Sequence, residues 1–422
     1  MGRSKHQKAK VPKPNQEANQ EGPKIALFYI MYNEEKIISR HLQSLVPLVP
    51  LVEGMTVVTN GTDNTIPIMK QWCDDHRIPF VSLFNPFDDF GHQRQRSYDL
   101  SKKSFPRATH DMTLDADHCL VIRDRSHLLT ELRGGGCILL RETFNRNEGW
   151  NRRIFARNHP FECWLRTHEI WITPDSTCRY IRASSCSIDD KSDGASHDVK
   201  YERDIRLLLL DHNENKESWN QYKRDTYHQR VSFYLAQSYY SLRQYTSAIT
   251  YYHLRSTQEG FPEEVYIAYW KGGHSHEQLA RIYRELLVNF NDGLTDQLNR
   301  KYQESGITIT GLTYYDIFQQ CTVHTREAIR LYQTATRYRP TRGEAIYDLV
   351  QWYRWLHQYH DALEWCEQGR ALSKSEDSFL VNPLVYDYLF DIELRHLRDS
   401  TDDHVIRTIG DQADRRLRKR NL

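Results

Sequence analysis

The chain has 422 residues, of which 39% are hydrophobic and 27% charged, and its formal net charge is +1. This length and composition are typical of a globular protein with two or three domains, and the near-zero charge excludes a general electrostatic attraction to nucleic acid or membranes. No run of about 18 apolar residues is present, so no transmembrane helix is predicted. The 8 cysteines form no C-x-x-C pair, which argues against a zinc site or a disulfide framework. We therefore expect a cytoplasmic protein with reduced thiols.

The two ends of the chain are predicted to be basic tails. Residues 1–23 are rich in Lys, Gln and Pro and lack the apolar segment of a secretory signal, so they are predicted to be disordered. Residues 401–422 end in the sequence RRLRKRNL and are predicted to form the second basic tail.

Residues 24–200 contain four short strand-forming runs that alternate with helical patterns. The runs are residues 25–30, 55–58, 79–83 and 111–114. This alternation indicates a mostly parallel sheet, and ligands of such sheets bind beyond the carboxyl ends of the strands. Clusters of polar residues follow the first, second and fourth runs, so we expect the functional site at that edge.

From residue 201 onward the strand signals stop. Residues 201–225 are predicted to form a connecting helix or linker, and residues 226–400 a helical repeat domain. The same five offsets recur in two stretches: Leu235, Tyr239, Tyr245, Ala248 and Tyr252, then Leu349, Tyr353, Tyr359, Ala362 and Cys366. The spacing resembles the tetratricopeptide repeat. Residues 261–311 fit the period poorly, and an unrelated helical bundle is the alternative.

Two acidic residues follow the fourth predicted strand, in the sequence Leu114-Asp115-Ala116-Asp117. In an extended segment residues i and i+2 face the same side, so Asp115 and Asp117 are expected to converge. Carboxylate oxygens are ligands that Mg²⁺ and Mn²⁺ prefer. A D-x-D sequence alone is common in turns, but its position at the end of a strand favours a metal site.

Two further polar clusters follow the first and second strands. Asn33, Glu34 and Glu35 suit hydrogen bonds to a nucleoside, although acidic residues also favour the first turn of a helix. Residues 60–65 contain Gly, Thr, Asp and Asn, a composition that taken alone indicates a turn before a helix.

Taken in order, these segments resemble the motifs of glycosyltransferase family 2, the inverting transferases of the A-type fold. The segments are Ile30-Met31-Tyr32-Asn33-Glu34-Glu35, Thr62-Asp63-Asn64-Thr65, Asp88-Asp89-Phe90-Gly91-His92-Gln93-Arg94 and Leu114-Asp115-Ala116-Asp117. Arg166-Thr167-His168-Glu169 and the stretch 193–205 are similar to the branch that carries tetratricopeptide repeats. The resemblance implies an α/β nucleotide-sugar-binding domain, A-type and Rossmann-like, followed by an all-α tetratricopeptide-like repeat domain.

The resemblance also implies roles on the donor side of the site. Tyr32, Asn33 and Glu34, with the loop at Asp63, would hold the base and ribose. Arg94 would lie near the diphosphate, because a guanidinium matches phosphate oxygens. Asp115 would bind ribose and metal, and Asp117 would bind the metal, Mn²⁺ or Mg²⁺.

On the acceptor side, the resemblance makes Glu169 the first candidate for general base, with His168 sharing that role or ligating the metal. Two positions depart from the family. Val58 stands where an Asp usually contacts the base, so the nucleotide stays open, with a UDP-sugar preferred. Asp189-Asp190 stand where many members have a His, so the third metal ligand is Asp190, His197 or His168.

The predicted function is metal-dependent, inverting sugar transfer, hexosyltransferase-like, from a nucleotide sugar to a glycan, peptide or protein acceptor. Two alternatives stay open: transfer to a modified nucleic-acid base, which the arginines of residues 151–166 permit, and a non-catalytic domain that serves as a protein-binding scaffold. We expect the repeats to recognise the acceptor, to contribute nothing to donor chemistry, and to pack on the first domain through residues 205–210.

Overall fold

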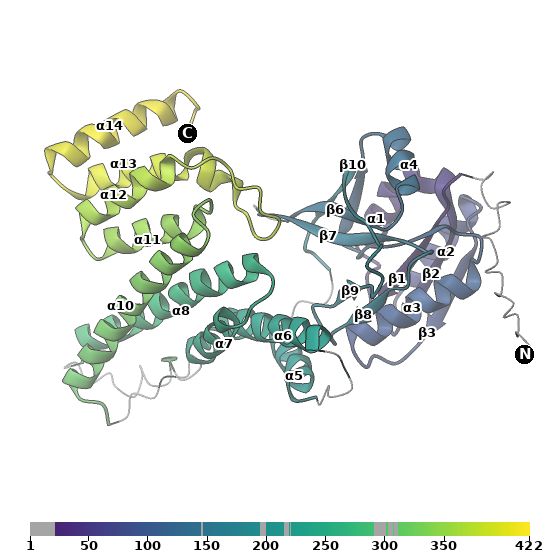
Figure 1. Ribbon diagram of the computed structural model, residues 1–422, viewed down its shortest axis with the longest axis horizontal. Helices are drawn as coiled ribbons and strands as arrows, with labels where there is room; N and C mark the ends of the chain where they lie inside the picture. Colours follow the sequence, from purple (N-terminus) through teal and green to yellow (C-terminus); the bar gives the residue numbers. More distant parts are fainter. Residues whose placement is uncertain are drawn as a thin grey trace, which may run out of the picture.

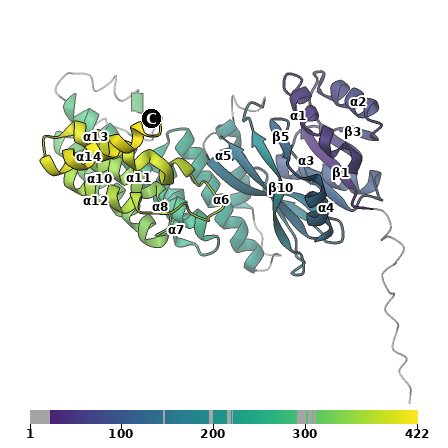
Figure 2. The same ribbon diagram turned by 90° about the horizontal axis from the view of Figure 1, so that it is seen from above.

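The structure is a computed structural model, and it describes residues 22–144, 147–194, 200–214, 219, 221–290, 301–302, 307 and 311–422. A sheet with flanking helices forms the N-terminal part, and a stack of helices forms the C-terminal part (Figure 1). Viewed from above, α5 and α6 lie on the side of the helical part that faces the sheet (Figure 2). The predicted disordered tail, residues 1–23, falls almost entirely outside the described residues.

Among the described residues, ten strands form one large sheet and a small two-stranded one. The large sheet has the order β3-β2-β1-β4-β7-β6-β10-β5, and the small sheet pairs β8 with β9. The strands are β1 Ile25–Met31, β2 Val52–Thr59, β3 Phe80–Phe84, β4 His110–Thr113, β5 His118–Ile122, β6 Cys137–Phe144, β7 Asn147–Ala156, β8 Glu162–Trp164, β9 Ile170–Ile172 and β10 Tyr180–Asp190.

The large sheet is mixed, whereas the sequence predicted a mostly parallel one. Strands β1 to β4 pair in parallel, and their positions agree with the four predicted runs. Strand β7 then pairs antiparallel with both β4 and β6. Strand β6 begins with the apolar residues Cys137 to Leu140, but charged residues follow on β6 and recur on β7, and neither strand was predicted. The two strands form a hairpin, which needs only a short connection.

Strand β1 is the centre of the fold, since it is apolar on both faces. Tyr29 belongs to the main core beneath helices α1 and α2. Phe28 points to the opposite face, where it packs edge-on against Trp171 with ring centroids 5.5 Å apart. A strand that is covered on both faces has an uninterrupted run of apolar residues in its sequence. For this reason β1 could be predicted.

The helices divide into those that flank the sheet and those that follow it. The first group is α1 Ile38–Ser44, the 3₁₀ helix η2 Val46–Leu51, α2 Thr65–Asp75, α3 Phe90–Ser104 and α4 Arg125–Arg133. The second group is α5 Lys200–Asn213, α6 Gln221–Ser241, α7 Tyr245–Thr257, α8 Pro262–Val288, α10 Tyr314–Tyr338, α11 Glu344–Trp355, α12 Tyr359–Arg370, the π-helical turn η4 Val385–Leu389, α13 Phe390–Ser400 and α14 His404–Arg418.

Two helix pairs share their local geometry at the spacing seen in the sequence. The turn between α6 and α7 contains Arg243 with φ of 59°, and the turn between α11 and α12 contains His357 with φ of 61°. Ala248 and Ala362 occupy the same offset and are fully buried between helices. In contrast α8 and α10 have 27 and 25 residues, which accounts for the poor fit there. The tetratricopeptide assignment stays a prediction.

The helical part contacts the sheet part in two places. Leu208 of α5 and Leu165, which follows β8, belong to one apolar cluster with residues of α6. The predicted packing through residues 205–210 is therefore present at Ile205, Leu208 and Leu209, whereas Leu210 is exposed. Farther on, Ser378 and Val381 bond to the backbone of β7 at Trp150 and Glu148. That stretch of β7 lies beyond the pairing with β4, and covering such an open edge satisfies its backbone groups.

The C-terminal segment differs from its prediction as a basic tail. Residues 404–418 form helix α14, which buries Ile406, Ala413 and Leu417 against α13. The basic residues lie among these apolar ones at helical spacing, so the segment is amphipathic and gains stability from packing. Within the described residues, no helix combines the length and apolar content needed to cross a bilayer.

Candidate functional site

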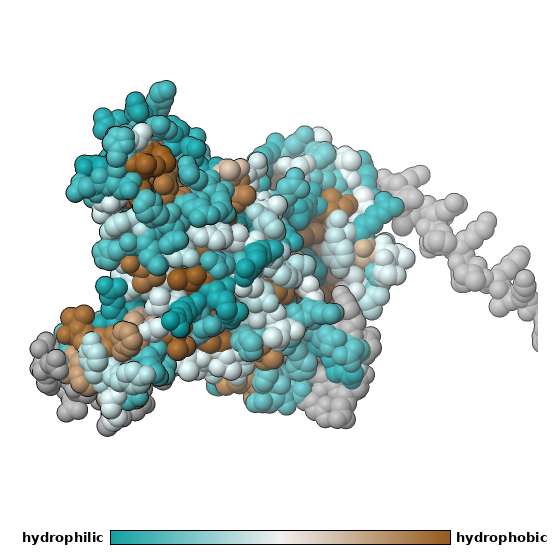
Figure 3. Space-filling view, turned by 60° about the vertical axis from the view of Figure 1, so that its left-hand side comes forward, coloured by the Kyte–Doolittle hydropathy of each residue, from teal (hydrophilic) through white to brown (hydrophobic). Residues whose placement is uncertain are grey.

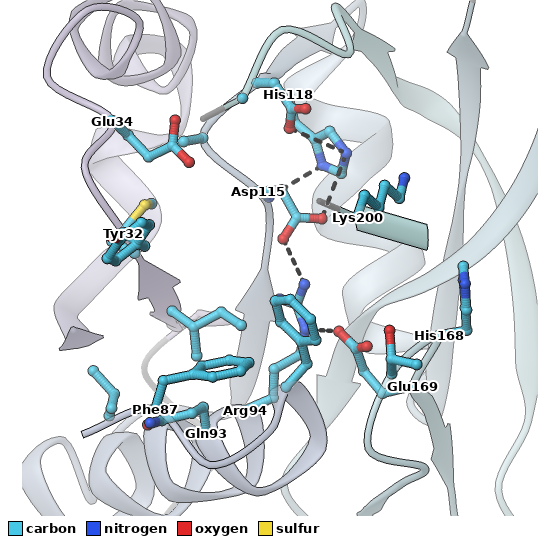
Figure 4. A pocket seen from close by; sticks show the side chains of 18 of the residues that line it. Tyr32, Glu34, Phe87, Gln93, Arg94, Asp115, His118, His168, Glu169 and Lys200 are labelled. Carbon is cyan, nitrogen blue, oxygen red and sulfur yellow. Dashed lines mark hydrogen bonds and ion pairs between the residues drawn. The ribbon is translucent and has the colours of Figure 1, made fainter. Parts of the chain in front are cut away.

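A cavity of about 640 Å³ lies at the carboxyl ends of β1 and β4. Its lining residues come from both parts of the chain and surround the open centre in Figure 4. The sheet part contributes Tyr32, Glu34, Val58, Phe87, Arg94, Asp115, Asp117, His118, Glu142, Arg153, His168, Glu169 and Asp190, and helix α5 contributes Lys200, Arg203 and Asp204. The predicted donor and acceptor sides therefore face one space.

Arg94 joins the two sides of this cavity. Its guanidinium donates to Asp115 at 2.6 Å and also to Glu169, as the dashed lines in Figure 4 show. Burial opposes the charge on Arg94, yet the carboxylates of Asp115 and Glu169 hold its pKa above the ordinary value. The sequence placed Arg94 near a diphosphate, whereas the structure places it between two carboxylates.

Asp115 is held as a charged group by two arginines. Burial by itself raises its pKa, but Arg94, His118 and Arg153 together lower it well below the usual range. Arg153 lies 3.5 Å from the second Asp115 oxygen and 2.5 Å from Glu142. The Asp115 carboxylate is thus already paired with arginine side chains of the protein. A metal ion could bind there only if it displaced one of these arginines.

Asp117 has a different environment, although it is only two residues away. Burial raises the pKa of Asp117, and the Asp115 charge raises it further. Within the described part of the chain no Lys or Arg pairs with Asp117 or Asp190. Ligand atoms of Asp117, His118 and Asp190 lie within 4.8 Å of one another, which is close enough for one small cation.

His118 contributes to this cluster in an unexpected way. Its Nδ1 accepts a hydrogen bond of 3.1 Å from the backbone N–H of Asp115, so in the neutral ring the proton is on Nε2. That nitrogen lies 3.6 Å from Asp115 and 4.0 Å from Asp117. A protonated nitrogen cannot ligate a metal, and the ring is better suited to donate to the carboxylates.

The residues present fit a divalent cation held by Asp117 and Asp190. These are hard oxygen donors, as Mn²⁺ and Mg²⁺ require, and among the described residues no Lys or Arg pairs with either carboxylate, although His118 lies 4.0 Å from Asp117. Gly194 borders the same space: a Cβ there would lie 3.4 Å from the Asp117 carboxylate and 3.6 Å from that of Glu34. His197, one predicted alternative ligand, lies outside the described residues.

Two predicted nucleotide-binding residues are used to hold loops together. The Asn33 side chain accepts from the backbone N–H groups of Thr62 and Asp63 at 2.9 and 3.3 Å. The Asp63 carboxylate accepts from Glu35 N–H at 3.0 Å and from Thr65. Neither residue lines the cavity, whereas Tyr32 and Glu34 do. Asn33 and Asp63 fasten the loop after β1 to the start of α2.

The predicted acceptor-side residues lie on the loop from Leu165 to Glu169, between β8 and β9. Leu165 and His168 both have left-handed backbones, with φ of 74° and 52°, a conformation that costs of order 1–3 kcal/mol in a non-glycine residue. The His168 Nε2 lies 3.4 Å from Asp204 of α5. Burial raises the pKa of Asp204, but hydrogen bonds from His168 and Thr167 lower it overall. His168 thus faces Asp204, and it is not among the residues whose ligand atoms lie together with those of Asp117 and Asp190.

Sequence reasoning missed several groups that shape this site. His118 directly follows Asp117 in the sequence, so its closeness to the two aspartates could have been predicted. Glu142 and Arg153 form a cross-strand ion pair on β6 and β7, and no local pattern marks either of them. Asp204 was noticed only within a resemblance at the domain junction, yet it is fully buried beneath His168 and Thr167.

No protein-family model and no curated protein matches the sequence. Solved structures with local similarity include S. aureus TarS residues 1–349, with 12% identity over 71% of this chain and 90% of that one and a TM-score of 0.32. A mannosyltransferase from Pyrobaculum calidifontis, in complex with GDP-Man and Mn²⁺, has 11% identity over 72% and 87% with a TM-score of 0.33. The chain spans 43% of the longer S. aureus TarS structure, at 12% identity over 51% of this chain and a TM-score of 0.29.

Proposed function

We propose that this protein is a metal-dependent glycosyltransferase that moves a sugar from a nucleotide-sugar donor to an acceptor hydroxyl. The observation that carries the proposal is the pair Asp117 and Asp190, whose ligand atoms lie together with those of His118 and which no Lys or Arg of the described residues pairs. This pair lies beside the linked Asp115–Arg94–Glu169 group. Both sets line one cavity at the carboxyl ends of parallel strands. The motif resemblance to glycosyltransferase family 2 supports the same assignment.

The donor nucleotide would lie along the strand-borne side. Tyr32 and Phe87 line the cavity with 50% and 37% of their surface exposed, and exposed aromatic rings favour stacking with a nucleobase. Glu34 would accept from ribose hydroxyls. A divalent cation held by Asp117 and Asp190 would supply Lewis-acid stabilisation of the charge that develops on the leaving diphosphate. Lys200 lines the same cavity from α5 and adds a positive charge.

The transfer step needs a group that accepts the acceptor's proton, and we assign it to Glu169. The acceptor oxygen attacks the anomeric carbon, the bond from that carbon to the diphosphate oxygen breaks, and the hydroxyl proton moves to the Glu169 carboxylate. A single displacement of this kind inverts the anomeric configuration. General base catalysis typically contributes about 10²–10⁴-fold. Arg94 holds the Glu169 carboxylate in place.

The acceptor is proposed to be a hydroxyl of a glycan, peptide or protein. The acceptor side of the cavity lies at the junction with the helical part, and stacked helix pairs offer an extended surface for long ligands. The face of that part visible in Figure 3 is mainly hydrophilic with a few apolar patches, which suits a polar acceptor.

The test is a panel of UDP- and GDP-linked hexoses incubated with the full chain in Mn²⁺, in Mg²⁺ and in EDTA, with release of the nucleoside diphosphate as the readout. We expect one donor class to be consumed, slowly by water in the absence of an acceptor, and only when the ion is present. Consumption that persists in EDTA would remove the metal from the proposal. If no donor is consumed under any condition and neither diphosphate binds, the glycosyltransferase assignment is wrong.

A further inference from the structure

The acceptor-side loop is fixed from the helical part of the chain, and this arrangement suggests roles for residues on α6. The imidazole of His168 stacks on the ring of Tyr234, with centroids 4.0 Å apart and an angle of 6° between the planes. No motif singled out Tyr234, because it lies 66 residues beyond the loop it contacts. Its position in the sequence is that of an ordinary residue in a repeat helix.

A second contact acts on the backbone of the same loop. Arg230, one turn earlier on α6, donates to the carbonyl oxygen of His168 at 3.3 Å and to the Tyr234 hydroxyl at 3.2 Å. That carbonyl belongs to the peptide unit between His168 and Glu169. The contacts to the imidazole and to this carbonyl together fix the orientation of the peptide plane, since the peptide unit is rigid. The direction in which the Glu169 side chain leaves the backbone is therefore fixed as well.

Arg230 is itself anchored in the interior of the helical part. Its guanidinium lies 3.3 Å from Glu264 of α8, and Arg255 of α7 lies 3.1 Å from the other oxygen of that carboxylate. Arg255 is fully buried and also donates to backbone carbonyls that follow α7. Three helices thus support one contact on the loop, and breaking a buried pair of this kind is costly.

We propose that Tyr234 and Arg230 are positioning residues of the transfer site, which hold His168 and Glu169 in the orientation that the acceptor hydroxyl requires. The inference rests on the proposed function for its kinetic consequence. It also assigns to α6, the first helix of the predicted repeats, a role distinct from binding the acceptor. In this role α6 holds the loop from Leu165 to Glu169 in its functional geometry. Donor binding, which depends on the strand-borne side, does not need these two residues.

The experiment compares three variants of the full chain. Tyr234→Leu removes the stack, Tyr234→Phe keeps it, and Tyr283→Leu removes a similar tyrosine–histidine stack between α8 and α10, where the Tyr283 and His324 rings are 5.6 Å apart. We expect Tyr234→Leu to lower kcat by about tenfold or more, because small misplacements of reacting groups are costly. Its affinity for UDP or GDP with Mn²⁺ should stay within about twofold of wild type. Tyr234→Phe should retain most of kcat, and Tyr283→Leu should leave it unchanged.

A readout independent of turnover separates this inference from the proposed function. In a double-mutant cycle on the melting temperature, Tyr234→Leu and His168→Ala should be non-additive, whereas Tyr283→Leu and His168→Ala should add. Additive effects in the first pair, or an equal loss of kcat in Tyr283→Leu, would overturn the inference. If the wild-type chain neither consumes a donor nor binds either diphosphate, the glycosyltransferase proposal fails, while the cycle still decides whether Tyr234 holds the loop.

Discussion

The two sides of the cavity reach their geometry by different routes. On the strand-borne side, Asp115 and Asp117 lie between β4 and β5, and Asp190 lies at the end of β10, which pairs with β5. On the other side, the loop from Leu165 to Glu169 has two left-handed residues and depends on partners from α3, α5 and α6. The carboxylates of the first side are held by the sheet, whereas the loop of the second side is held by contacts from the helices. Substitutions on the two sides should therefore have separate effects.

The largest effect is expected on the strand-borne side. Asp117→Ala should reduce turnover by about 10³-fold or more, because a metal ion supplies several kcal/mol of transition-state stabilisation. The melting temperature should hardly change, since Asp117 lies at a strand end and has unfavourable neighbours when charged. The matched control is Asp189→Ala. This substitution removes the carboxylate next to Asp190 in the sequence, which pairs with Lys191, and it should leave turnover intact. Metal-dependent turnover that survives Asp117→Ala would refute the ligand assignment.

A smaller loss is expected from the proposed base. Glu169→Gln should lower kcat by roughly 10²-fold with donor affinity nearly unchanged, because the amide keeps the shape but accepts no proton. Donor affinity is measured by titrating the diphosphate in the presence of Mn²⁺. Should affinity collapse together with kcat, Glu169 would serve mainly to orient Arg94 and the donor side, and His168 would become the better candidate for the base.

The acceptor-side loop also depends on a close approach by α3. A Cβ on Gly91 would collide with the carbonyl oxygen of Leu165, and the N–H of Phe90 donates to Arg166 at 2.9 Å. Gly91→Ala should displace the loop, with kcat falling about tenfold and diphosphate affinity unaltered. Gly272→Ala is the control, since its added Cβ meets side chains only at 3.6 Å. Equal losses of kcat and affinity in Gly91→Ala would show that the two sides are not separable.

The smallest effect concerns the response of the helical part to acid. Burial lowers the pKa of His276 and of His324 to about 4 from 6.5, and the two rings share a hydrogen bond of 2.8 Å. A lowered pKa means that the folded form prefers neutral histidine, so this stability is complete above pH 6.5 and is lost as pH falls toward 4. We expect the melting temperature to drop over that window, and His324→Gln to flatten the drop. An unchanged profile in the variant would assign the acid response to other groups.

The strand-borne side was predicted from the residue pattern itself, whereas Glu169 and His168 of the loop were predicted only through the family resemblance, and this difference has a physical reason. Strand β1 shows its apolar run because it is buried on both faces. The sequence predicted Asp115 and Asp117 in an extended segment, whereas Asp117 lies in the turn between β4 and β5, where the N–H of His118 donates to the Asp115 carbonyl oxygen. The mixed half of the sheet was missed because Glu142 and Arg153 satisfy each other across β6 and β7, a pairing without a local signature. Tyr234 and Asp204 contact His168 although they lie 66 and 36 residues away in the sequence. No periodic sequence pattern indicates such long-range contacts.

The most direct measurement is the melting temperature of the full chain with UDP or GDP, each added with Mn²⁺, with Mg²⁺ or with EDTA, for wild type and Asp117→Ala. A ligand that binds the folded state raises its apparent stability by mass action. We predict that one diphosphate stabilises the wild-type chain only when the ion is present, and that Asp117→Ala abolishes this stabilisation while melting normally alone. Stabilisation that is equal with and without the ion, or that survives Asp117→Ala, would contradict a metal-dependent donor site at Asp117 and Asp190.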